Sequence, residues 1–404
     1  MKTMIESTKL FWYDSDIPDS LLTEILIRLP LKSIFRFKTV SKRWLSLISD
    51  AFFARYYVTR INNDSALSRS HQPWILLFPY FYKKVLPTDT VIRFPTSFNP
   101  VGFYELSSSL FSLSFLPVRP EDSVLSLHII ASSNGLVLCC RNAYPLTYYL
   151  CNPLTKQHVI LPTPPKPASF CHAMDAGIIC KDDGSYTVVR IPNEESSSNM
   201  LELEIFSSET GTWTELNFSC QVHNYSRRNH KRFYSTISYN GILLWAADKQ
   251  IFAYDPYRNT DQCYSMELPK CSERLERYSL AICCGRLCCL AAGKSLTLWE
   301  LTSYKSGKWN LKHQIKLGDI SSIDAMVHEG FRSDGRISFR PLAMHPFNWD
   351  TVYGSCGSRL ISYNLRTRMS DLIDYGLIPA ALHPFILPPW PTMIPQPSWG
   401  PDDM

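Results

Sequence analysis

The sequence lacks the features that place a protein in or across a membrane. Although 45% of the 404 residues are hydrophobic, no run approaches the roughly 18 consecutive apolar residues of a membrane-spanning helix. The first sixteen residues, MKTMIESTKLFWYDSD, are polar overall and contain no apolar stretch of the kind a secretory signal requires. We therefore expect no membrane partner and a location in the cytoplasm, the nucleus or both.

The motifs of the common catalytic sites are also missing. We find no Gly-x-Ser-x-Gly elbow, no phosphate-binding Gly-x-x-x-x-Gly-Lys and no His-Glu-x-x-His. The segment Gly354 to Gly357 resembles a cysteine-protease turn, but it lies near the end of the chain among strand patterns, and such local signatures transfer poorly between families. We expect a non-enzymatic protein with no catalytic residue and no cofactor.

Neither sign of charge is in large excess, since the sequence has 41 basic and 36 acidic residues. This balance does not predict a nucleic-acid partner. The 13 cysteines are odd in number and include no two Cys-x-x-Cys pairs, so neither a disulfide framework nor a zinc site is expected. Buried, reduced thiols are the expectation, and they include three adjacent pairs: Cys139 and Cys140, Cys283 and Cys284, and Cys288 and Cys289.

One short segment is densely basic. Arg227, Arg228, Lys231 and Arg232 lie close together beside several aromatic residues. They could contact an acidic or phosphorylated partner, and we carry them forward as possible substrate-binding residues. The alternative is a solvated loop between two structural repeats.

The one strongly helical part of the chain is Ile17 to Arg60. Apolar residues at helical spacing predict a first helix ending near Pro30, a second from Leu31 to Val40, and two more that begin after Ser41 and Asp50. Four short helices cannot enclose all the large apolar residues of this stretch. The excess predicts a partner surface; the alternative is packing against the C-terminal neighbour.

The same stretch resembles the F-box. The match consists of an apolar-Pro start at Ile17, Leu-x-x-Glu-Ile-Leu from Leu21, Arg-Leu-Pro from Arg28, and Val-Ser-Lys-x-Trp from Val40. The resemblance implies docking onto a Skp-type adaptor. It assigns nine residues to that contact or to the packing just beneath it: Ile17, Pro18, Leu22, Ile25, Leu26, Pro30, Ile34, Val40 and Trp44.

Two of these nine, Pro18 and Leu26, are expected to be buried anchors of the adaptor interface. Nearby Lys32, Arg36 and Lys38 have no acidic neighbour between Leu31 and Ser49. They are therefore expected to steer an acidic partner surface.

From Trp74 to Ile378 the chain reads as short strands broken by Gly, Pro, Asn and Asp. About 300 residues exceed a usual β-sandwich or small barrel. Internal similarity favours a propeller: Ser133 to Cys139 is echoed by Tyr239 to Trp245, and at 40 to 50 residues per repeat the region holds roughly six or seven blades. In a closed propeller, Asn134-Gly135 and Asn240-Gly241 should occupy equivalent turns.

This region resembles the F-box-associated, kelch-like domain of plant F-box proteins. The predicted fold is an α+β multidomain chain, in which a small all-α F-box precedes an all-β propeller-like domain. The predicted boundaries are a flexible N-terminus at 1–15, the F-box at 16–60, a linker at 61–73, the propeller at 74–378 and a proline-rich tail at 379–404.

The tail has two interpretations. A proline-rich run favours extended polyproline II geometry and could be a ligand for an aromatic-lined groove. Alternatively it forms a strap over the propeller edge through Phe385, Ile386 and Trp390.

The resemblance implies a substrate-recognition adaptor of a Skp, cullin, F-box ubiquitin ligase. Its partners would be the Skp-type adaptor, through it a cullin, and an unknown substrate protein. Two alternatives stay open. The propeller could sense or bind a small molecule or glycan, or the F-box protein could act without a cullin.

Overall fold

The structure is a computed structural model in which the chain divides into two compact units, residues 1–72 and 73–404. The predicted flexible N-terminus and most of the predicted linker lie outside the described residues. The structure describes residues 17–63, 74–77, 113, 115–117, 127–141, 146–166, 175–181, 183–192, 200–219, 235–247, 250–258, 262–269, 277–303, 307–317, 339–357, 359–375 and 382–395.

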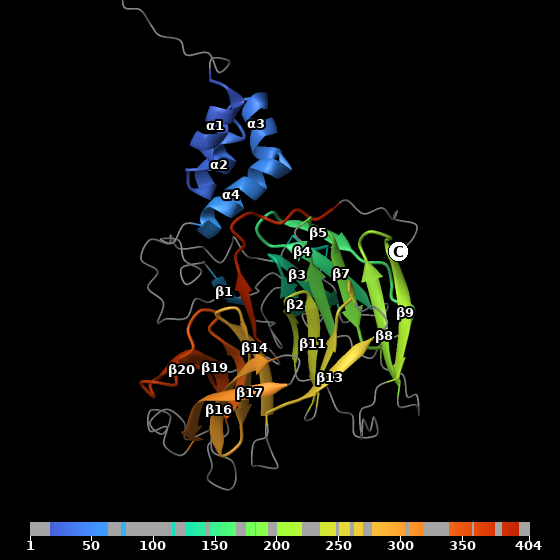
Figure 1. The fold of residues 1–404 in the computed structure, drawn as a ribbon, viewed down its shortest axis with the longest axis vertical. Helices are drawn as coiled ribbons and strands as arrows, with labels where there is room; N and C mark the ends of the chain where they lie inside the picture. The colour runs from blue at the N-terminus through green and yellow to red at the C-terminus, as the bar shows by residue number, and fades with distance from the viewer. Residues whose placement is uncertain are drawn as a thin grey trace, which may run out of the picture. The chain divides into compact units, whose positions relative to one another are not determined.

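The first unit contains four helices, α1 (Asp19–Leu26), α2 (Leu31–Phe37), α3 (Lys42–Ser49) and α4 (Ala51–Asn63), drawn in blue in Figure 1. A proline precedes each of the first two helices. Proline suits this position because a backbone N–H there would have no partner within the helix, and the proline carbonyl can accept the first hydrogen bond of the helix. The Pro18 carbonyl accepts from the Leu22 N–H at 3.0 Å.

Side-chain caps start the other two helices, as the sequence predicts. The Ser41 hydroxyl accepts from the Trp44 N–H at 3.2 Å, and the Asp50 carboxylate accepts from the Phe52 N–H at 2.6 Å. Because α4 continues to Asn63, the helical unit runs three residues past the predicted boundary at Arg60.

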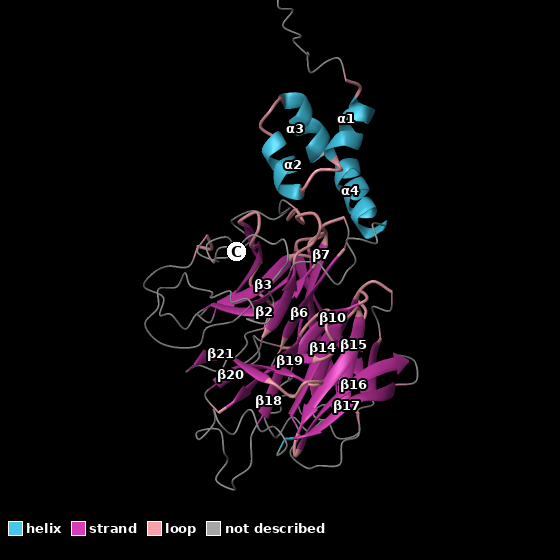
Figure 2. Ribbon diagram, turned by 90° about the vertical axis from the view of Figure 1, so that its left-hand side faces the viewer, coloured by secondary structure: helices cyan, strands magenta, loops and turns pink. Residues whose placement is uncertain are grey.

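The second unit is built of strands, magenta in Figure 2. The described residues form five four-stranded antiparallel sheets in which strands follow one another in chain order, as in propeller blades. Blade 1 holds β2 (Leu127–Ser133), β3 (Leu136–Arg141), β4 (Thr147–Asn152) and β5 (Gln157–Ile160). Blade 2 holds β6 (Ala176–Cys180), β7 (Tyr186–Arg190), β8 (Met200–Ser207) and β9 (Thr212–Ser219).

The remaining three blades repeat this order. Blade 3 holds β10 (Ser235–Tyr239), β11 (Ile242–Ala247), β12 (Gln250–Tyr254) and β13 (Cys263–Glu267). Blade 4 holds β14 (Arg277–Cys283), β15 (Arg286–Ala292), β16 (Ser295–Ser303) and β17 (Lys308–Lys316). Blade 5 holds β18 (Phe339–Met344), β19 (Thr351–Cys356), β20 (Arg359–Asn364) and β21 (Ser370–Tyr375).

The prediction of six or seven blades is therefore wrong. That prediction divided the length of the region from Trp74 to Ile378 by the length of one repeat, which assumes that every residue belongs to a blade. The strands that the structure describes form five four-stranded sheets and the two-stranded ribbon of β1 and β22. The five blades occupy only part of the region from Trp74 to Ile378.

A two-stranded ribbon closes the ring. Strand β1 (Trp74–Leu77) pairs antiparallel with β22 (His383–Ile386), which joins the two ends of the second unit. One face of the ribbon packs on blade 1 and the other on blade 5, so the ribbon fills the space between the first and last blades. The ribbon packs through Ile75, Leu77 and Phe385 on one side, and through Trp74 and Leu76 on the other.

Equivalent hairpin turns recur between the first two strands of three blades. Asn134 and Gly135 both have positive φ, 45° and 77°, and Asn240 and Gly241 have 50° and 78°. Two consecutive residues with positive φ are typical of type I′ turns, which Asn-Gly favours. The predicted equivalence of these turns is confirmed, and a third copy uses Cys284 and Gly285.

Tryptophans on outer strands tie neighbouring blades together. The Trp213 indole of blade 2 donates to the Pro162 carbonyl at 2.8 Å, just after blade 1. The Trp309 indole of blade 4 donates to the Glu267 carbonyl of blade 3 at 3.0 Å. The repeated Gly-x-Trp turns of the sequence therefore mark inter-blade hydrogen bonds.

The described part of the tail, residues 382–395, lies against the propeller. After β22 it crosses the turns of blades 1 and 2, where the Asn152 amide donates to the Thr392 carbonyl at 2.7 Å and Ile394 is buried among residues of both blades. A Cβ at Gly135 would lie 2.5 Å from the Pro388 ring, so only glycine fits beneath it. The strap interpretation of the tail agrees with this placement, with Phe385 buried in the ring closure.

Candidate adaptor-binding surface

The helical unit has a small core drawn from all four helices and the turn after α1. The described residues with almost no exposed surface are Leu22, Leu26, Ile27, Ile34, Ile48, Phe53 and Tyr57. Seven side chains make a modest core, and cores of this size contribute only a few kcal/mol. Hydrogen bonds between the helices therefore contribute part of the stability of this unit.

Four hydrogen bonds from three side chains join segments of this unit that are far apart in sequence. The Arg43 guanidinium of α3 donates to the Asp19 carboxylate at the start of α1 at 2.8 Å and to the Ile17 carbonyl. On the other side of α1, Tyr56 donates to Glu24, and Arg60 donates to the Ile27 carbonyl. The Asp19 carboxylate, in the first turn of α1, therefore binds Arg43 and does not cap its own helix.

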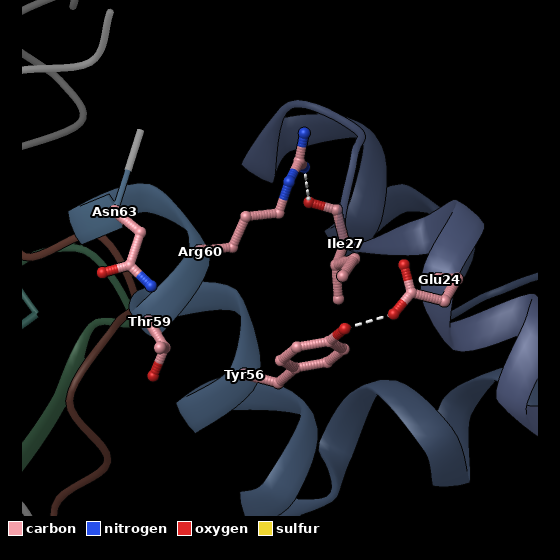
Figure 3. Close-up of a pocket in the computed structure, with 6 residues that line it drawn as sticks. All are labelled: Glu24, Ile27, Tyr56, Thr59, Arg60 and Asn63. Atoms are coloured by element: carbon pink, nitrogen blue, oxygen red, sulfur yellow. Dashed lines mark hydrogen bonds between the residues drawn. The ribbon is translucent and has the colours of Figure 1, made fainter. Parts of the chain in front are cut away.

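Figure 3 shows an open hollow of about 440 Å³ at these last two contacts. It is lined by α1, the turn that follows it and α4. The largest cause that raises the pKa of Tyr56 is its hydrogen bond to Glu24, and burial is the second. Because Tyr56, Glu24 and Arg60 are already bonded within the unit, the hollow offers a ligand little free polar chemistry.

The exposed apolar surface is larger than the core would suggest. Six of the eleven exposed large hydrophobic side chains in the described parts of the chain belong to this one unit. We call them the exposed apolar set: Ile17, Leu21, Ile25, Val40, Leu45 and Phe52. The predicted excess of apolar residues over core space is confirmed, and apolar exposure this concentrated is typical of interaction surfaces.

The nine predicted contact residues separate into three groups by burial. Leu22, Leu26 and Ile34 are buried, so they form the packing beneath the surface rather than the surface itself. Trp44 is half-buried and packs edge-on against Phe37, with ring centroids 5.3 Å apart. The exposed members are Ile17, Pro18, Ile25, Pro30 and Val40.

Two corrections follow from this placement. Leu26, expected as a buried anchor of the interface, is 0% exposed within the free chain and belongs to the core, whereas Pro18 is exposed. Leu21, Leu45 and Phe52 are also exposed, and the predicted contact residues did not include them. The spacing of Leu21 and Ile25, one turn apart beside the buried pair Leu22 and Leu26, was the signal for a second apolar stripe.

Basic residues accompany this apolar surface. Between residues 17 and 63 the sequence has eight Lys and Arg against three Asp and Glu, a formal charge of +5 that equals that of the whole chain. Arg36 is exposed, and the Lys38 ammonium lies 4.8 Å from the Phe35 ring, where burial lowers the pKa of Lys38. The side chain of Lys32 lies outside the described residues.

The propeller residues selected from the sequence cannot be placed. Arg227, Arg228, Lys231 and Arg232 lie outside the described residues, between β9 and β10. Where the chain is described, no group of three His, Cys, Asp or Glu is arranged to hold a metal ion. The ten described cysteines form no disulfide with one another, and burial raises the pKa of Cys180 to about 12 and that of Cys356 to about 11.

Comparison with known families identifies both units. The F-box domain matches residues 15–55, which contain most of the four helices. The family described as F-box protein At3g26010-like, beta-propeller, matches residues 95–376, more than half of the chain. The chain belongs to this family of F-box proteins. An F-box joined to a β-propeller is the composition of a substrate receptor of the Skp, cullin, F-box type, a non-catalytic role.

Its relatives in Arabidopsis thaliana have the same composition. This F-box protein is 26% identical to the putative F-box/kelch-repeat protein At4g22430 over 375 residues, covering 88% of this chain and 79% of that protein. It is 28% identical to the putative F-box/kelch-repeat protein At1g15680 over 398 residues, covering 91% and 87%. It is 27% identical to F-box protein At3g26010 over 383 residues, covering 88% and 79%.

The predicted F-box followed by a propeller, in a plant-type protein, is confirmed; the kelch-like character of the blades stays a prediction. Among the helices that the structure describes, none is both long and apolar enough to cross a membrane.

Proposed function

We propose that this F-box protein is the substrate-recognition subunit of a Skp, cullin, F-box ubiquitin ligase. The F-box docks on a Skp-type adaptor, the adaptor connects to a cullin, and the propeller holds the protein to be ubiquitinated. The observation that carries the proposal is the exposed apolar set, because it gathers in the unit that matches the F-box.

The docking surface combines two kinds of interaction. Ile25, Val40 and their neighbours supply apolar area that loses water on docking, which provides most of the affinity. The charge of +5 over residues 17–63 attracts an acidic adaptor surface and raises the association rate, an effect that salt weakens. Leu22, Leu26 and Ile34 hold the helices that present these side chains.

The propeller contributes recognition rather than chemistry. A ring closed by β1 and β22 keeps a fixed shape and presents loops at two edges. Positioning a bound substrate near the conjugating enzyme raises the effective concentration of its lysines, which requires no catalytic residue in this chain.

Affinity purification from plant cells tests this function. The full chain should retain a Skp-type adaptor, a cullin and a substrate, whereas a chain that begins at residue 64 should lose the first two and keep the third. The deletion ends after α4, because Asn63 is the last helical residue. Recovery of the adaptor without a cullin would favour action outside a ligase, and loss of every partner but a small molecule would contradict the proposal.

A further inference from the structure

The turn between α2 and α3 carries an exposed hydroxyl beside the exposed apolar set. Residues 38–40 form this turn, and Thr39 is exposed at its centre. Val40, the next residue, is 57% exposed and belongs to the exposed apolar set. A group added to the Thr39 hydroxyl would therefore lie at the surface that we propose receives the adaptor.

The turn does not depend on the Thr39 hydroxyl for its shape. The hydroxyl and the amide of Thr39 both donate to the Arg36 carbonyl, at 2.8 and 3.2 Å. Two further backbone hydrogen bonds, donated by the Lys38 and Val40 amides, close the same turn. Modification of the hydroxyl would remove only the side-chain bond, so the backbone bonds would still hold the turn.

Ser41, two residues further on, carries a hydroxyl in a different situation. Ser41 is half-buried, and its hydroxyl accepts from the Trp44 N–H as the N-cap of α3. Loss of such a cap costs helix stability. Of these two hydroxyls, that of Thr39 is the one that an enzyme can reach without disturbing the fold.

Basic residues flank Thr39 in the sequence. Arg36 lies three residues before it, Lys38 one residue before it and Lys42 three residues after it. Arg36 and Lys42 are exposed, and the sequence has no acidic residue between positions 31 and 49. Protein kinases select their substrates partly by the pattern of charge around the acceptor hydroxyl. Exposed basic residues before the acceptor fit a kinase whose substrate groove is acidic.

We propose that Thr39 is a phosphorylation site for a protein kinase that selects basic residues before its acceptor, and that the phosphate prevents docking of the Skp-type adaptor. The inference rests on the proposed function, since it states how docking is regulated. In the reaction the Thr39 hydroxyl oxygen forms a bond to the γ-phosphorus of ATP, and the bond from that phosphorus to the bridging oxygen of ADP breaks. The hydroxyl proton passes to the catalytic aspartate of the kinase.

The phosphate would reverse the charge at one part of the docking surface. Phosphothreonine carries close to two negative charges at neutral pH, in a unit whose formal charge is +5 over residues 17–63. An acidic adaptor surface is attracted by the unmodified turn and repelled by the phosphate. Docking that buries Val40 would also have to strip water from the phosphate beside it, which is costly for a charged group.

Docking and phosphorylation should therefore exclude each other. An adaptor bound over Val40 covers the turn that holds Thr39, so the kinase cannot reach the hydroxyl. Because the two events are linked through the same free chain, whatever the phosphate costs adaptor binding, the bound adaptor costs phosphorylation.

The test uses the full chain, purified without its adaptor, and a protein kinase that selects arginine three residues before the acceptor. Mass spectrometry of fragments locates the phosphate, and affinity for a plant Skp-type adaptor is measured before and after treatment. Phosphate should appear at Thr39, and adaptor affinity should fall at least about tenfold. Arg36→Gln should slow incorporation at Thr39 about tenfold, since one charge-assisted contact with the kinase is lost. Saturating adaptor, added first, should block incorporation at Thr39.

The matched control is Thr59→Ala. Thr59 is also exposed, and its hydroxyl also donates to a backbone carbonyl, that of Arg55 at 2.8 Å, but it lies within α4. This variant should still take up phosphate at Thr39 and lose adaptor affinity on treatment. The affinity of Thr39→Ala should be the same before and after treatment.

Three results would each overturn the inference: no phosphate at Thr39, incorporation there that saturating adaptor does not reduce, or unchanged adaptor affinity after full phosphorylation of Thr39. A loss of affinity on treatment of Thr39→Ala would do the same, because it would place the effect at another residue. Adaptor binding by the untreated chain tests the proposed function separately. A chain that takes up phosphate at Thr39 but binds no adaptor before treatment would contradict the ligase function and leave Thr39 as a modification site.

Discussion

Ile25 and Leu26 are adjacent in the sequence, but one side chain is exposed and the other is buried. Replacing each in turn by alanine should therefore distinguish an effect on adaptor binding from an effect on folding of the helical unit. Ile25 is 52% exposed on α1, whereas Leu26 is 0% exposed. Burying a whole isoleucine side chain is worth about 1.5–3 kcal/mol, so docking can still gain about half of that from Ile25. We expect Ile25→Ala to weaken adaptor binding by about 0.8–1.5 kcal/mol, roughly four- to twelvefold.

Leu26→Ala should act through the core instead. Replacing a fully buried leucine by alanine costs about 2–5 kcal/mol. That equals most of the stability available to a core of this size, so the helices should open and adaptor binding should be lost with them.

The assay for both variants is adaptor affinity together with amide hydrogen exchange across residues 17–63 in the full chain. Ile25→Ala should keep wild-type protection and bind more weakly, and Leu26→Ala should lose protection. Met369→Ala is the control, because Met369 is 62% exposed but lies in blade 5. Wild-type affinity for Ile25→Ala, or preserved protection for Leu26→Ala, would refute this division of the F-box into surface and core.

Three further predictions concern the propeller. Cys284→Asn should raise the free energy of unfolding by about 0.5–1 kcal/mol, and with it the melting temperature, because Cys284 has φ 49° in a turn where two other blades use asparagine. An unchanged melting temperature would contradict this. A chain ending at residue 381 should lose its cooperative melt, since β22 and the strap are gone, whereas one ending at 395 should keep it; equal melts would show that the ribbon does not close the ring. Burial lowers the pKa of His345 and His383 to about 4, so between about pH 6.5 and 4 only the unfolded chain takes up their protons and stability should fall as pH drops. His345→Asn, which keeps an acceptor for a backbone N–H, should flatten this dependence in melts at several pH values, and an unaltered slope would exclude His345 as its source.

The helical unit was readable from the sequence because its signals are local. A cap such as Ser41 acts within three residues, and apolar residues one turn apart share a face whatever surrounds them. The F-box motif, the four helices and the surplus of apolar side chains all follow from such short-range patterns. Burial of individual residues does not, which is why the core position of Leu26 and the exposure of Leu45 were not predicted.

The hairpins of the propeller were also local, and the positive-φ turns at Asn134 and Asn240 were found from Asn-Gly alone. The number of blades was not, because it depends on how much of the chain the connections consume.

The closure of the ring cannot be predicted from local sequence patterns. Trp74 and Ile386 form a registered pair across more than three hundred residues, and no short-range signal specifies that partner. The same holds for Ser279 and Leu342, which form a hydrogen bond only because the innermost strands β14 and β18 lie side by side in the ring. The sequence alone determined which residues form helices, strands and turns, since those depend on neighbours along the chain. Which elements meet and how many blades result were decided by tertiary packing, because they depend on neighbours in space.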